Sequence, residues 1–468
     1  MTRDAASIHA RRRSRLYDRL KEGVALLFAA PEARLGWDTE YRYRPDPDFL
    51  YLTGFGEPDA VAVLDADRRR FVLFVRPRDR ERETWTGYRA GVKGAVRDHG
   101  ADEAHAVEDL PKLLPDLLRK ASTLHYALGV DPERDRTVGE ILGRFRREAR
   151  NPLRGPVRVL DVTEALHEMR LVKEPEEIAL MERSCEIAAR AHDDAREAAR
   201  PGRFEYEAEA AVMRRFLETG ASGFSYAPIV ASGPNATVLH YVENRRRIEE
   251  GDLVLVDAGC EYEGYASDIT RTFPASGRFT REQEEVYRTV LAAQEAAISK
   301  VVPGRPFQDA HDAAVEVLVD GLLSMGLLKD KRKSVLRKRS YERFYMHRTS
   351  HWLGMDVHDR GRYLDAAGEP RLLVPGMVLT VEPGLYVRPD EKKVPGRFLG
   401  IGVRIEDDVL VTEDGNRVLT ASAPKSVEAM TSPPARRAGR ALTPRRASER
   451  PLPRVSRRSS AGRPRTRS

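Results

Sequence analysis

Two aspartates stand where a pair of predicted strands could bring them together. The apolar run Leu253 to Gly259 (LVLVDAG) contains Asp257, and the following strand-like run, Tyr265 to Phe273 (YASDITRTF), contains Asp268. These carboxylates could face each other across a hairpin. Two carboxylates at that distance repel, which raises the pKa of one of them unless a cation neutralises the pair. A shared metal ion is the natural partner, and exposed hairpin carboxylates are the alternative.

Histidines are concentrated in a second segment. Met346 to Asp359 (MHRTSHWLGMDVHD) places His347, His351 and His358 within twelve residues of a chain that has eleven histidines in all. Neutral imidazole is a common metal ligand. The alternative is a set of histidines that have ordinary hydrogen-bond partners in the interior or lie at the surface.

Two further segments place a glutamate within apolar sequence. In Val378 to Tyr386 (VLTVEPGLY), Glu382 interrupts a predicted strand that the following Pro-Gly pair ends. Burying such a carboxylate without a partner is costly. In Gly402 to Asp408 (GVRIEDD), Arg404 and Glu406 are two residues apart and are therefore predicted to share one face of a strand. There they could form a salt bridge or contribute to a common site.

The four segments together supply four carboxylates and one imidazole as candidate metal ligands, namely Asp257, Asp268, His351, Glu382 and Glu406. This hard, oxygen-rich set suits two Mn(II) or similar divalent ions bridged by hydroxide. The two cysteines, Cys185 and Cys260, are too few for a thiolate metal cage or a disulfide framework. We expect both to be reduced and packed in the interior.

The elements that must position these residues fall into two regions, as the length of 468 residues favours. From about residue 20 to 165, strand-like runs such as Ala60 to Leu64 and Arg70 to Val75 alternate with helical patterns near 106–119 and 133–149, which predicts an α/β domain. The sequence pattern changes near residue 170, where a long helical pattern replaces the alternation of strands and helices. We therefore predict an N-terminal extension over 1–20, a first domain over 21–170 and a second domain over 171–428.

The second region has a coarse internal repeat. Pro175 can occupy the first turn of a helix, and the apolar residues that follow recur at helical spacing. Two predicted helices are followed by strands, and the pattern then repeats; the four helices cover about 175–200, 204–219, 282–301 and 307–326. Two similar halves that face each other would create a central cleft. The predicted class is α+β.

Charge is distributed unevenly along the chain. Residues 433–468 hold twelve Arg and one Glu, a net charge of +11, whereas the whole chain has +7, so the remainder has −4. The segment 429–468 has little to bury and is predicted to be disordered. Its basic residues could contact nucleic acid, and the alternative is a solvated extension.

Composition also bears on the compartment. No apolar run approaches the roughly 18 to 20 residues that span a bilayer, so we expect no membrane role. The basic N-terminus has no apolar segment behind it and does not resemble a secretory signal. A cytoplasmic location is therefore the default expectation.

The order and context of the candidate ligands, over about residues 40–425, resemble the pita-bread metallopeptidase family and in particular its aminopeptidase P branch. The resemblance implies a creatinase-like N-terminal α/β domain followed by a pita-bread catalytic domain. It implies that the five residues named above hold two divalent ions, most simply Mn(II). Because relatives commonly form dimers or tetramers, it also implies a homo-oligomer.

Further residues take roles from the same resemblance. The stretch Val238 to Asn244 (VLHYVEN) is similar to a conserved stretch of the family, which implies that His240 lines the substrate pocket. It implies that His358 lies near the scissile carbonyl with His347 nearby, and that Arg404 is a partner of the metal-binding carboxylates.

The resemblance extends to the first domain and has one departure in the second. Pro45 to Pro58 (PDPDFLYLTGFGEP) is similar to the companion domain of this branch, and Trp85 to Gly91 (WTGYRAG) resembles a loop that helps to close an active site in relatives. Methionine aminopeptidases lack this domain. Arg348 stands where members of the family commonly have Gly, so the shape of that turn is expected to differ.

The implied activity is release of an N-terminal residue that precedes proline. A metal-bridging hydroxide would attack the carbonyl of that residue, while the free amine of the peptide binds at the metal centre. Glu382 would carry the proton to the leaving proline nitrogen, and His358 would support the developing charge. The alternatives are an Xaa-Pro dipeptidase (prolidase) with the same site and a non-catalytic pita-bread binding module.

Overall fold

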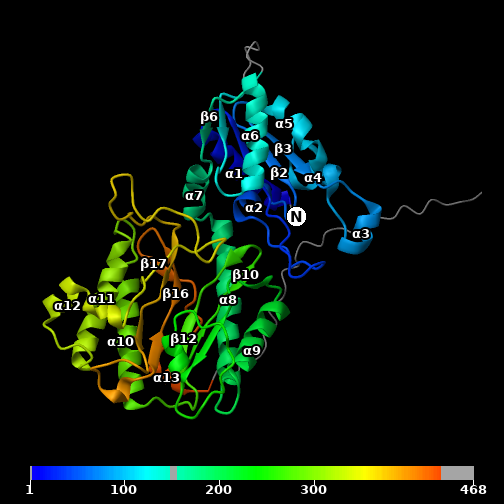
Figure 1. Ribbon diagram of the computed structural model, residues 1–468. Coiled ribbons are helices and arrows are strands. Elements are labelled where there is room, and N and C mark those ends of the chain that lie inside the picture. The colour runs from blue at the N-terminus through cyan, green and yellow to red at the C-terminus, as the bar shows by residue number, and fades with distance from the viewer. Residues whose placement is uncertain (1–2, 148–154, 434–468) are drawn as a thin grey trace, which may run out of the picture. The chain divides into compact units, whose positions relative to one another are not determined.

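The computed structural model describes residues 3–147 and 155–433, which fall into two compact units (Figure 1). The first unit ends at Asp161 and the second begins at Val162, nine residues before the predicted boundary. Helix α7 (Thr163–Leu171) therefore belongs to the second unit, where Leu171 is part of the hydrophobic core. The change of texture that the sequence shows near residue 170 corresponds to the start of the next helix, at Pro175.

A six-stranded sheet organises the first unit, in the order β4-β3-β2-β1-β5-β6. Its strands are β1 (Val24–Phe28), β2 (Val61–Asp65), β3 (Arg70–Val75), β4 (Glu103–Ala106), β5 (Thr123–His125) and β6 (Arg158–Leu160). The predicted pair of runs forms the antiparallel ladder of β2 and β3. The pairs β3 with β4, β1 with β5 and β5 with β6 are parallel, so the domain is of the α/β type that the sequence predicts.

Six helices accompany this sheet: α1 (Arg3–Leu20), α2 (Pro47–Thr53), α3 (Arg80–Thr86), α4 (Gly91–His99), α5 (Leu110–Leu118) and α6 (Pro132–Arg147). Helices α5 and α6 correspond to the predicted helical patterns. They bury Leu114 and Phe145 in a cluster that also contains Val63 of β2. The sheet face and the two helices thus share one hydrophobic core.

Residues 1–20, predicted as an extension, contain helix α1, which packs in the first unit. Leu16 and Tyr17 are buried. Arg13 donates from Nη1 to the carbonyl oxygen of Leu52 at 2.9 Å, which satisfies an acceptor at the end of α2. The arginine-rich sequence concealed this helix because the guanidinium groups bind backbone carbonyls instead of facing solvent.

The second unit contains the four predicted helices as two pairs, α8 (Pro175–Ala198) with α9 (Glu205–Glu218), and α10 (Arg281–Ile298) with α11 (Gln308–Ser324). Figure 1 shows the two pairs on opposite sides of the strands of this unit. Residues at the helix starts explain the boundaries. Thr280 caps α10 by accepting from the backbone N–H of Gln283, whose side chain accepts from the backbone N–H of Thr280 in return.

Short strands lie between the helix pairs. They are β7 (Gly223–Phe224), β8 (Ile229–Ser232), β9 (Leu253–Asp257), β10 (Cys260–Tyr262), β11 (Tyr265–Ala266), β12 (Thr270–Pro274), β13 (Val378–Val381), β14 (Gly384–Val387), β15 (Ile401–Arg404), β16 (Asp407–Val411) and β17 (Asn416–Val418). They pair as β12-β9-β8, β11-β10-β7, β13-β16-β17 and β14-β15. An isolated bridge from Thr270 to Glu406 joins the strands of the two halves. The predicted internal repeat of helices and strands is therefore present.

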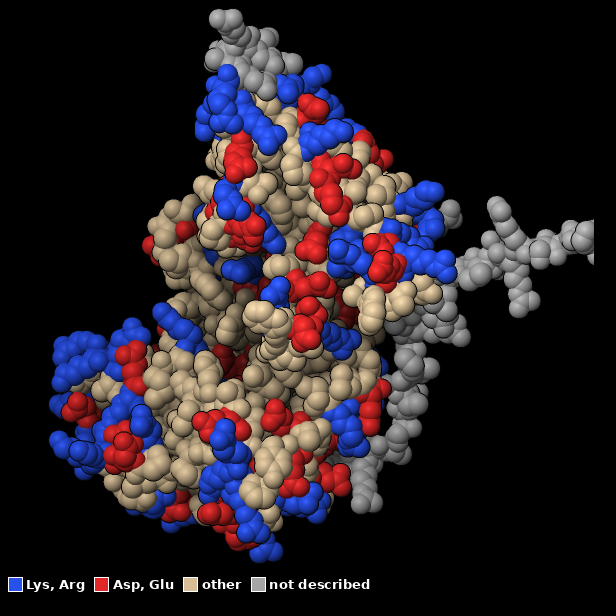
Figure 2. Space-filling model, turned by 45° about the vertical axis from the view of Figure 1, so that its right-hand side comes forward, with Lys and Arg blue, Asp and Glu red and all other residues tan. Residues whose placement is uncertain are grey.

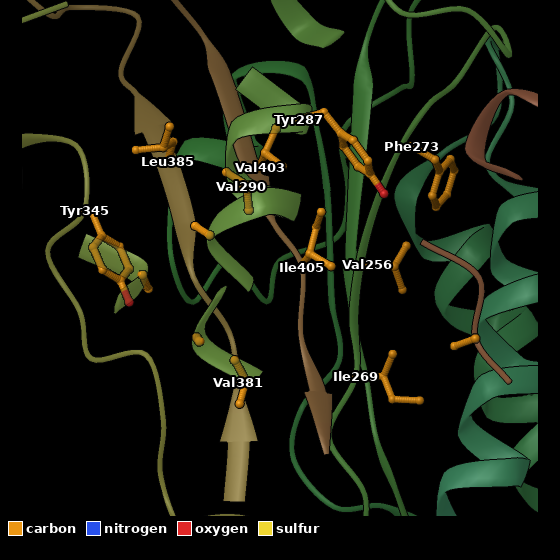
Figure 3. Close-up of a cluster of buried hydrophobic side chains, with 14 of the residues drawn as sticks. Val256, Ile269, Phe273, Tyr287, Val290, Tyr345, Val381, Leu385, Val403 and Ile405 are labelled. Atoms are coloured by element: carbon orange, nitrogen blue, oxygen red, sulfur yellow. The ribbon is translucent and has the colours of Figure 1, made fainter. Parts of the chain in front are cut away.

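Buried aliphatic residues hold the strand ends in place. Figure 3 shows Val256, Ile269, Val381 and Ile405 within the core of the second unit, and each is next in sequence to a predicted metal ligand. Successive side chains of an extended chain point in opposite directions. Packing of Val256 therefore directs Asp257, the last residue of β9, to the opposite side of the strand. The other three apolar residues fix the backbone beside carboxylates that lie outside the strands.

The predicted start of the tail at residue 429 lies inside a short helix. Helix α13 (Val427–Thr431) buries Met430, and Arg196 donates to the carbonyl oxygens of Ala429 and Ser432. The folded chain thus continues past residue 428. Residues 434–468, to which the expected disorder and nucleic-acid contact also refer, lie outside the described residues. One further short helix, α12 (Arg332–Lys338), completes the unit.

Cys185 and Cys260 are free and buried, as expected. None of the helices in the described part of the chain combines the length and the apolar composition needed to cross a membrane. Figure 2 shows Lys and Arg interspersed with Asp and Glu over the face in view.

Candidate metal centre

A cavity of about 840 Å³ opens within the second unit. Every residue that the sequence assigned to the site lines it: His240, Asp257, Asp268, His347, His351, His358, Glu382, Arg404 and Glu406. The carboxylates stand at strand ends or in breaks between strands. Asp257 is the last residue of β9, and Glu382 lies between β13 and β14.

Two predicted strands are interrupted at the site. The run from Tyr265 to Phe273 forms β11 and β12, and Asp268 lies in the break between them. Arg404 ends β15 and Glu406 precedes β16, so these two residues do not share the face of one strand as predicted. The breaks free the carboxylates from the regular alternation of a strand.

Contacts from distant residues stabilise the two breaks. The backbone N–H of Asp268 donates to the side chain of Asp408 at 3.0 Å, and that of Glu406 donates to the carbonyl oxygen of Thr270 at 3.1 Å. The hydroxyl of Thr270 also donates to Glu406 Oε2 at 2.6 Å. Buried backbone groups need such partners wherever a ladder is interrupted.

Asp268, His351 and Glu406 form a group that could hold a metal ion, with one candidate ligand atom of each lying within 4.8 Å of the others. His351 Nδ1 lies 3.0 Å from the carbonyl oxygen of Trp352, so this nitrogen carries a proton. His351 Nε2 faces Asp268 Oδ2 at 3.4 Å and Glu382 Oε1 at 3.7 Å. Burial alone would lower the pKa of His351, but the neighbouring Asp268 and Glu382 raise it to about 9, so without a cation Nε2 also carries a proton. A metal ion would replace the Nε2 proton, and the contact of Nδ1 with the carbonyl of Trp352 would orient the ring for such a ligand role.

Tyr226 connects the two aspartates, and the sequence analysis did not identify it. Its hydroxyl lies 2.5 Å from Asp257 Oδ1 and 2.5 Å from Asp268 Oδ1. Burial and the charges of both aspartates raise the pKa of Tyr226 well above its ordinary value, so the phenol keeps its proton and donates. No ligand-type residue neighbours Tyr226 in sequence, and the contact depends on the fold.

Tyr226→Phe is expected to weaken metal binding by about 10- to 100-fold, as loss of a group that orients ligands commonly does. The Mn(II) concentration that gives half-maximal activity measures this effect. Tyr206→Phe, at a half-exposed tyrosine outside the cavity lining, is the matched control. An unchanged metal requirement in Tyr226→Phe would show that the hydroxyl does not orient the aspartates.

Three hydrogen bonds hold the side chain of Arg404. Its spacing in the sequence suggested a salt bridge with Glu406, but the structure pairs it with Asp257. It donates to Asp257 Oδ2 at 2.5 Å, to Tyr386 at 3.1 Å and to Thr270 at 3.2 Å. The buried guanidinium of Arg404 therefore forms its ion pair with Asp257. Tyr386, which the sequence analysis also missed, in turn lies 2.9 Å from His347 Nε2.

The remaining histidines lie around the predicted ligands. The ring of His358 meets that of His351 edge-on, with centroids 4.4 Å apart, and His347 Nδ1 lies 3.7 Å from Glu382 Oε2. Burial, together with the charge of Arg404, lowers the pKa of His347 to about 3. This histidine is therefore neutral near pH 7 and offers a hydrogen-bonding ring without adding charge.

The charge balance of the site fits bound divalent cations. Burial raises the pKa of Glu406 well above its usual range, as do the charges of the other carboxylates, and burial raises that of Glu382 to about 7. Burial also raises the pKa of Asp257, despite the opposing charge of Arg404. Carboxylates that are difficult to ionise in each other's presence become stable anions when a metal neutralises them.

Two family models match the chain. Metallopeptidase family M24 matches residues 179–413, and the aminopeptidase P N-terminal domain matches residues 9–126. The chain belongs to the aminopeptidase P branch of metallopeptidase family M24. The N-terminal model begins within α1, so most of the predicted extension belongs to the aminopeptidase P N-terminal domain.

Individual relatives agree with this assignment to aminopeptidase P. The chain is 44% identical over 427 residues to the Xaa-Pro aminopeptidase of Escherichia coli, covering 90% of this chain and 96% of that protein. It is 37% identical over 418 residues to the mitochondrial intermediate cleaving peptidase 55 of Arabidopsis thaliana, covering 89% and 80%.

Solved structures share both domains of aminopeptidase P. The structure of Pseudomonas aeruginosa aminopeptidase PepP superposes with a TM-score of 0.89 at 46% identity, covering 91% of this chain and 97% of that one. E. coli aminopeptidase P in complex with substrate gives a TM-score of 0.88 at 44% identity and the same coverage. The fold is therefore the two-domain aminopeptidase P fold with a pita-bread catalytic domain.

Proposed function

We propose that this metallopeptidase releases the N-terminal residue from peptides that have proline in the second position. The observation that carries the proposal is the convergence of four carboxylates and one imidazole on a single cavity. The similarity to Xaa-Pro aminopeptidases over nine tenths of the chain supports the same activity.

Asp257, Asp268, His351, Glu382 and Glu406 would hold two divalent ions. Oxygen-rich sites of this kind suit Mn(II), which is our proposed metal. A zinc-substituted form of E. coli aminopeptidase P is among the similar structures, and elemental analysis of the purified protein distinguishes the two metals. When bound, the ions would supply an activated water and stabilise the negative charge that develops on the carbonyl oxygen.

We assign the remaining catalytic and positioning roles to four side chains that line the cavity. Glu382 faces two histidines, with its oxygens 3.7 Å from His351 Nε2 and from His347 Nδ1, and is our candidate for carrying a proton to the leaving proline nitrogen. His358 would support the charge on the scissile carbonyl, and His240 would contact the substrate from the cavity wall. Arg404 would act by holding Asp257 in place.

Assays of the metal-free protein with added Mn(II) test the function. We expect cleavage of an Xaa-Pro-Yaa tripeptide, with little attack on the matching Xaa-Pro dipeptide or on an Xaa-Ala-Yaa peptide. Preference for the dipeptide would identify a prolidase. Cleavage of the alanine peptide at an equal rate would remove the proline requirement, and inactivity on all three would favour a binding module.

Metal removal is expected to lower the melting temperature of the second unit as well as to abolish activity. The buried carboxylates repel one another without a cation, and a ligand at 100 times its Kd adds about 2.7 kcal/mol of stability. Scanning calorimetry of the chelated protein, with and without added Mn(II), measures the change. Equal melting temperatures with and without the metal would contradict the proposed ligand set.

A homo-oligomer and a cytoplasmic location are further parts of the proposal. Exposed aromatic side chains of the first unit support an interface between copies, since Trp37 is 94% and Trp85 is 85% exposed. Analytical ultracentrifugation tests the dimer or tetramer, and fractionation of cells tests the location. A monomer at micromolar concentration would refute the first of these.

A further inference from the structure

Arg348 lies on the wall of the catalytic cavity as an exposed guanidinium. It donates from Nη1 to Gln308 Oε1 at 3.3 Å. Among the described residues, none forms an ion pair with it. The other guanidinium of the cavity wall, that of Arg404, is buried and occupied by Asp257. Arg348 therefore leaves most of its hydrogen-bond donors available to a ligand in the cavity.

The backbone on both sides of Arg348 is fixed by contacts within the site. The carbonyl oxygen of Arg348 lies 2.8 Å from His347 Nδ1. Thr349 is buried, its carbonyl oxygen accepts from the backbone N–H of Glu382 at 2.8 Å, and its hydroxyl lies 2.9 Å from His311 Nδ1. The side chain thus projects from an ordered turn, so little backbone entropy is lost when it binds a ligand.

Neighbouring groups do not neutralise the charge of Arg348. Burial and, to a smaller extent, the charge of Arg348 together lower the pKa of His311 to about 4, so this ring is neutral near pH 7. Gln308 is also neutral. A permanent, unpaired guanidinium favours a planar anion that accepts two parallel hydrogen bonds, and a carboxylate fits this geometry.

We propose that Arg348 binds the C-terminal carboxylate of a tripeptide substrate, an inference that rests on the proposed function. In an Xaa-Pro-Yaa peptide, two residues separate the scissile carbonyl from this carboxylate, and two extended residues span at most about 7 Å. Arg348 follows His347 in the sequence, both residues line the cavity, and His347 is 3.7 Å from Glu382. Arg348 would make short peptides with a free C-terminus the preferred substrates.

Paired substrates test this specificity. An Xaa-Pro-Yaa tripeptide with a neutral Yaa is compared as the free acid and as the C-terminal amide, for the wild type and for Arg348→Gln. We expect kcat/KM of the wild type to be about tenfold higher for the acid, which corresponds to one partly exposed charge-assisted pair. The difference should lie mainly in KM, should nearly vanish in Arg348→Gln and should return in part in Arg348→Lys.

Controls separate this role from others. Arg278→Gln removes an exposed charge outside the cavity lining and should keep the wild-type ratio. Inhibition by a Pro-Yaa dipeptide acid and its amide gives the same comparison for binding alone. An acid-to-amide ratio that is near one in the wild type, or unchanged in Arg348→Gln, would overturn the inference while both peptides are still cleaved. Failure of the wild type to cleave either peptide would overturn the proposed function and this inference with it.

Discussion

Glu382→Gln is expected to lower kcat for the Xaa-Pro tripeptide by about 10²- to 10⁴-fold, the usual contribution of a positioned general acid or base. The amide has nearly the shape of the carboxylate but cannot accept and return a proton. Glu382 is well placed for the transfer because its two oxygens face His351 and His347 at 3.7 Å. Steady-state kinetics at saturating Mn(II), together with the metal content of the purified variant, measure the effect.

A control variant and the metal content of Glu382→Gln distinguish proton transfer from metal binding. Glu413→Gln, at an exposed glutamate outside the cavity lining, makes the same chemical change away from the site and should leave kcat unchanged. Turnover equal to wild type in Glu382→Gln, with both metal ions retained, would eliminate the proton-transfer role. Loss of metal together with loss of activity would show that Glu382 acts mainly as a metal ligand and not mainly in proton transfer.

Asp407→Asn is expected to reduce the free energy of unfolding by about 3–5 kcal/mol, because it breaks a buried ion pair. Asp407 is buried and accepts from Arg271 at 2.6 Å, from Lys425 at 2.6 Å and from Gln294 at 2.7 Å. In the variant, Arg271 loses the carboxylate that balances its charge. Urea unfolding monitored by circular dichroism measures the loss, with Asp330→Asn at an exposed position as the control.

The pH dependence of the free energy of unfolding is a second test of the contacts that Asp407 makes. Burial alone would raise the pKa of Asp407, but the charges of Arg271 and Lys425 lower it to about 2. A carboxylate whose pKa is depressed in the folded state adds stability above its unfolded pKa, near 4, and this stability is lost as the pH falls towards 2. Wild-type stability should therefore fall more steeply than that of Asp407→Asn over this interval. Parallel curves would mean that the network contributes no net stability.

The candidate ligands could be proposed from the sequence because each lies in a short segment with a strong local pattern. The core strand before Asp257 and the histidine-rich run around His351 are visible without any knowledge of the fold. Helix α8, predicted over about 175–200, spans Pro175–Ala198, since proline at its start and apolar spacing are local signals. The residues that surround the candidate ligands were harder to predict from the sequence.

Long-range contacts account for what could not be predicted. Tyr226 reaches Asp268 across 42 positions of the sequence, and its own neighbours give no sign of this role. The break at Asp268 depends on Asp408, 140 positions away, so local pattern favoured one continuous strand. Helix α1 was overlooked because its arginines, which usually mark solvent-facing chain, bind carbonyl groups of α2.

The order in which the proposed metal-binding segments occur along the chain should affect kinetics as well as equilibrium. Asp257 and Glu406 are 149 positions apart in the sequence, and the bridge from Thr270 to Glu406 brings the two halves together at the site. A ligand set assembled from such distant segments is complete only when both halves have docked. Bound metal should then slow unfolding while leaving the refolding rate almost unchanged. The lifetime of the folded enzyme would accordingly depend on the supply of metal.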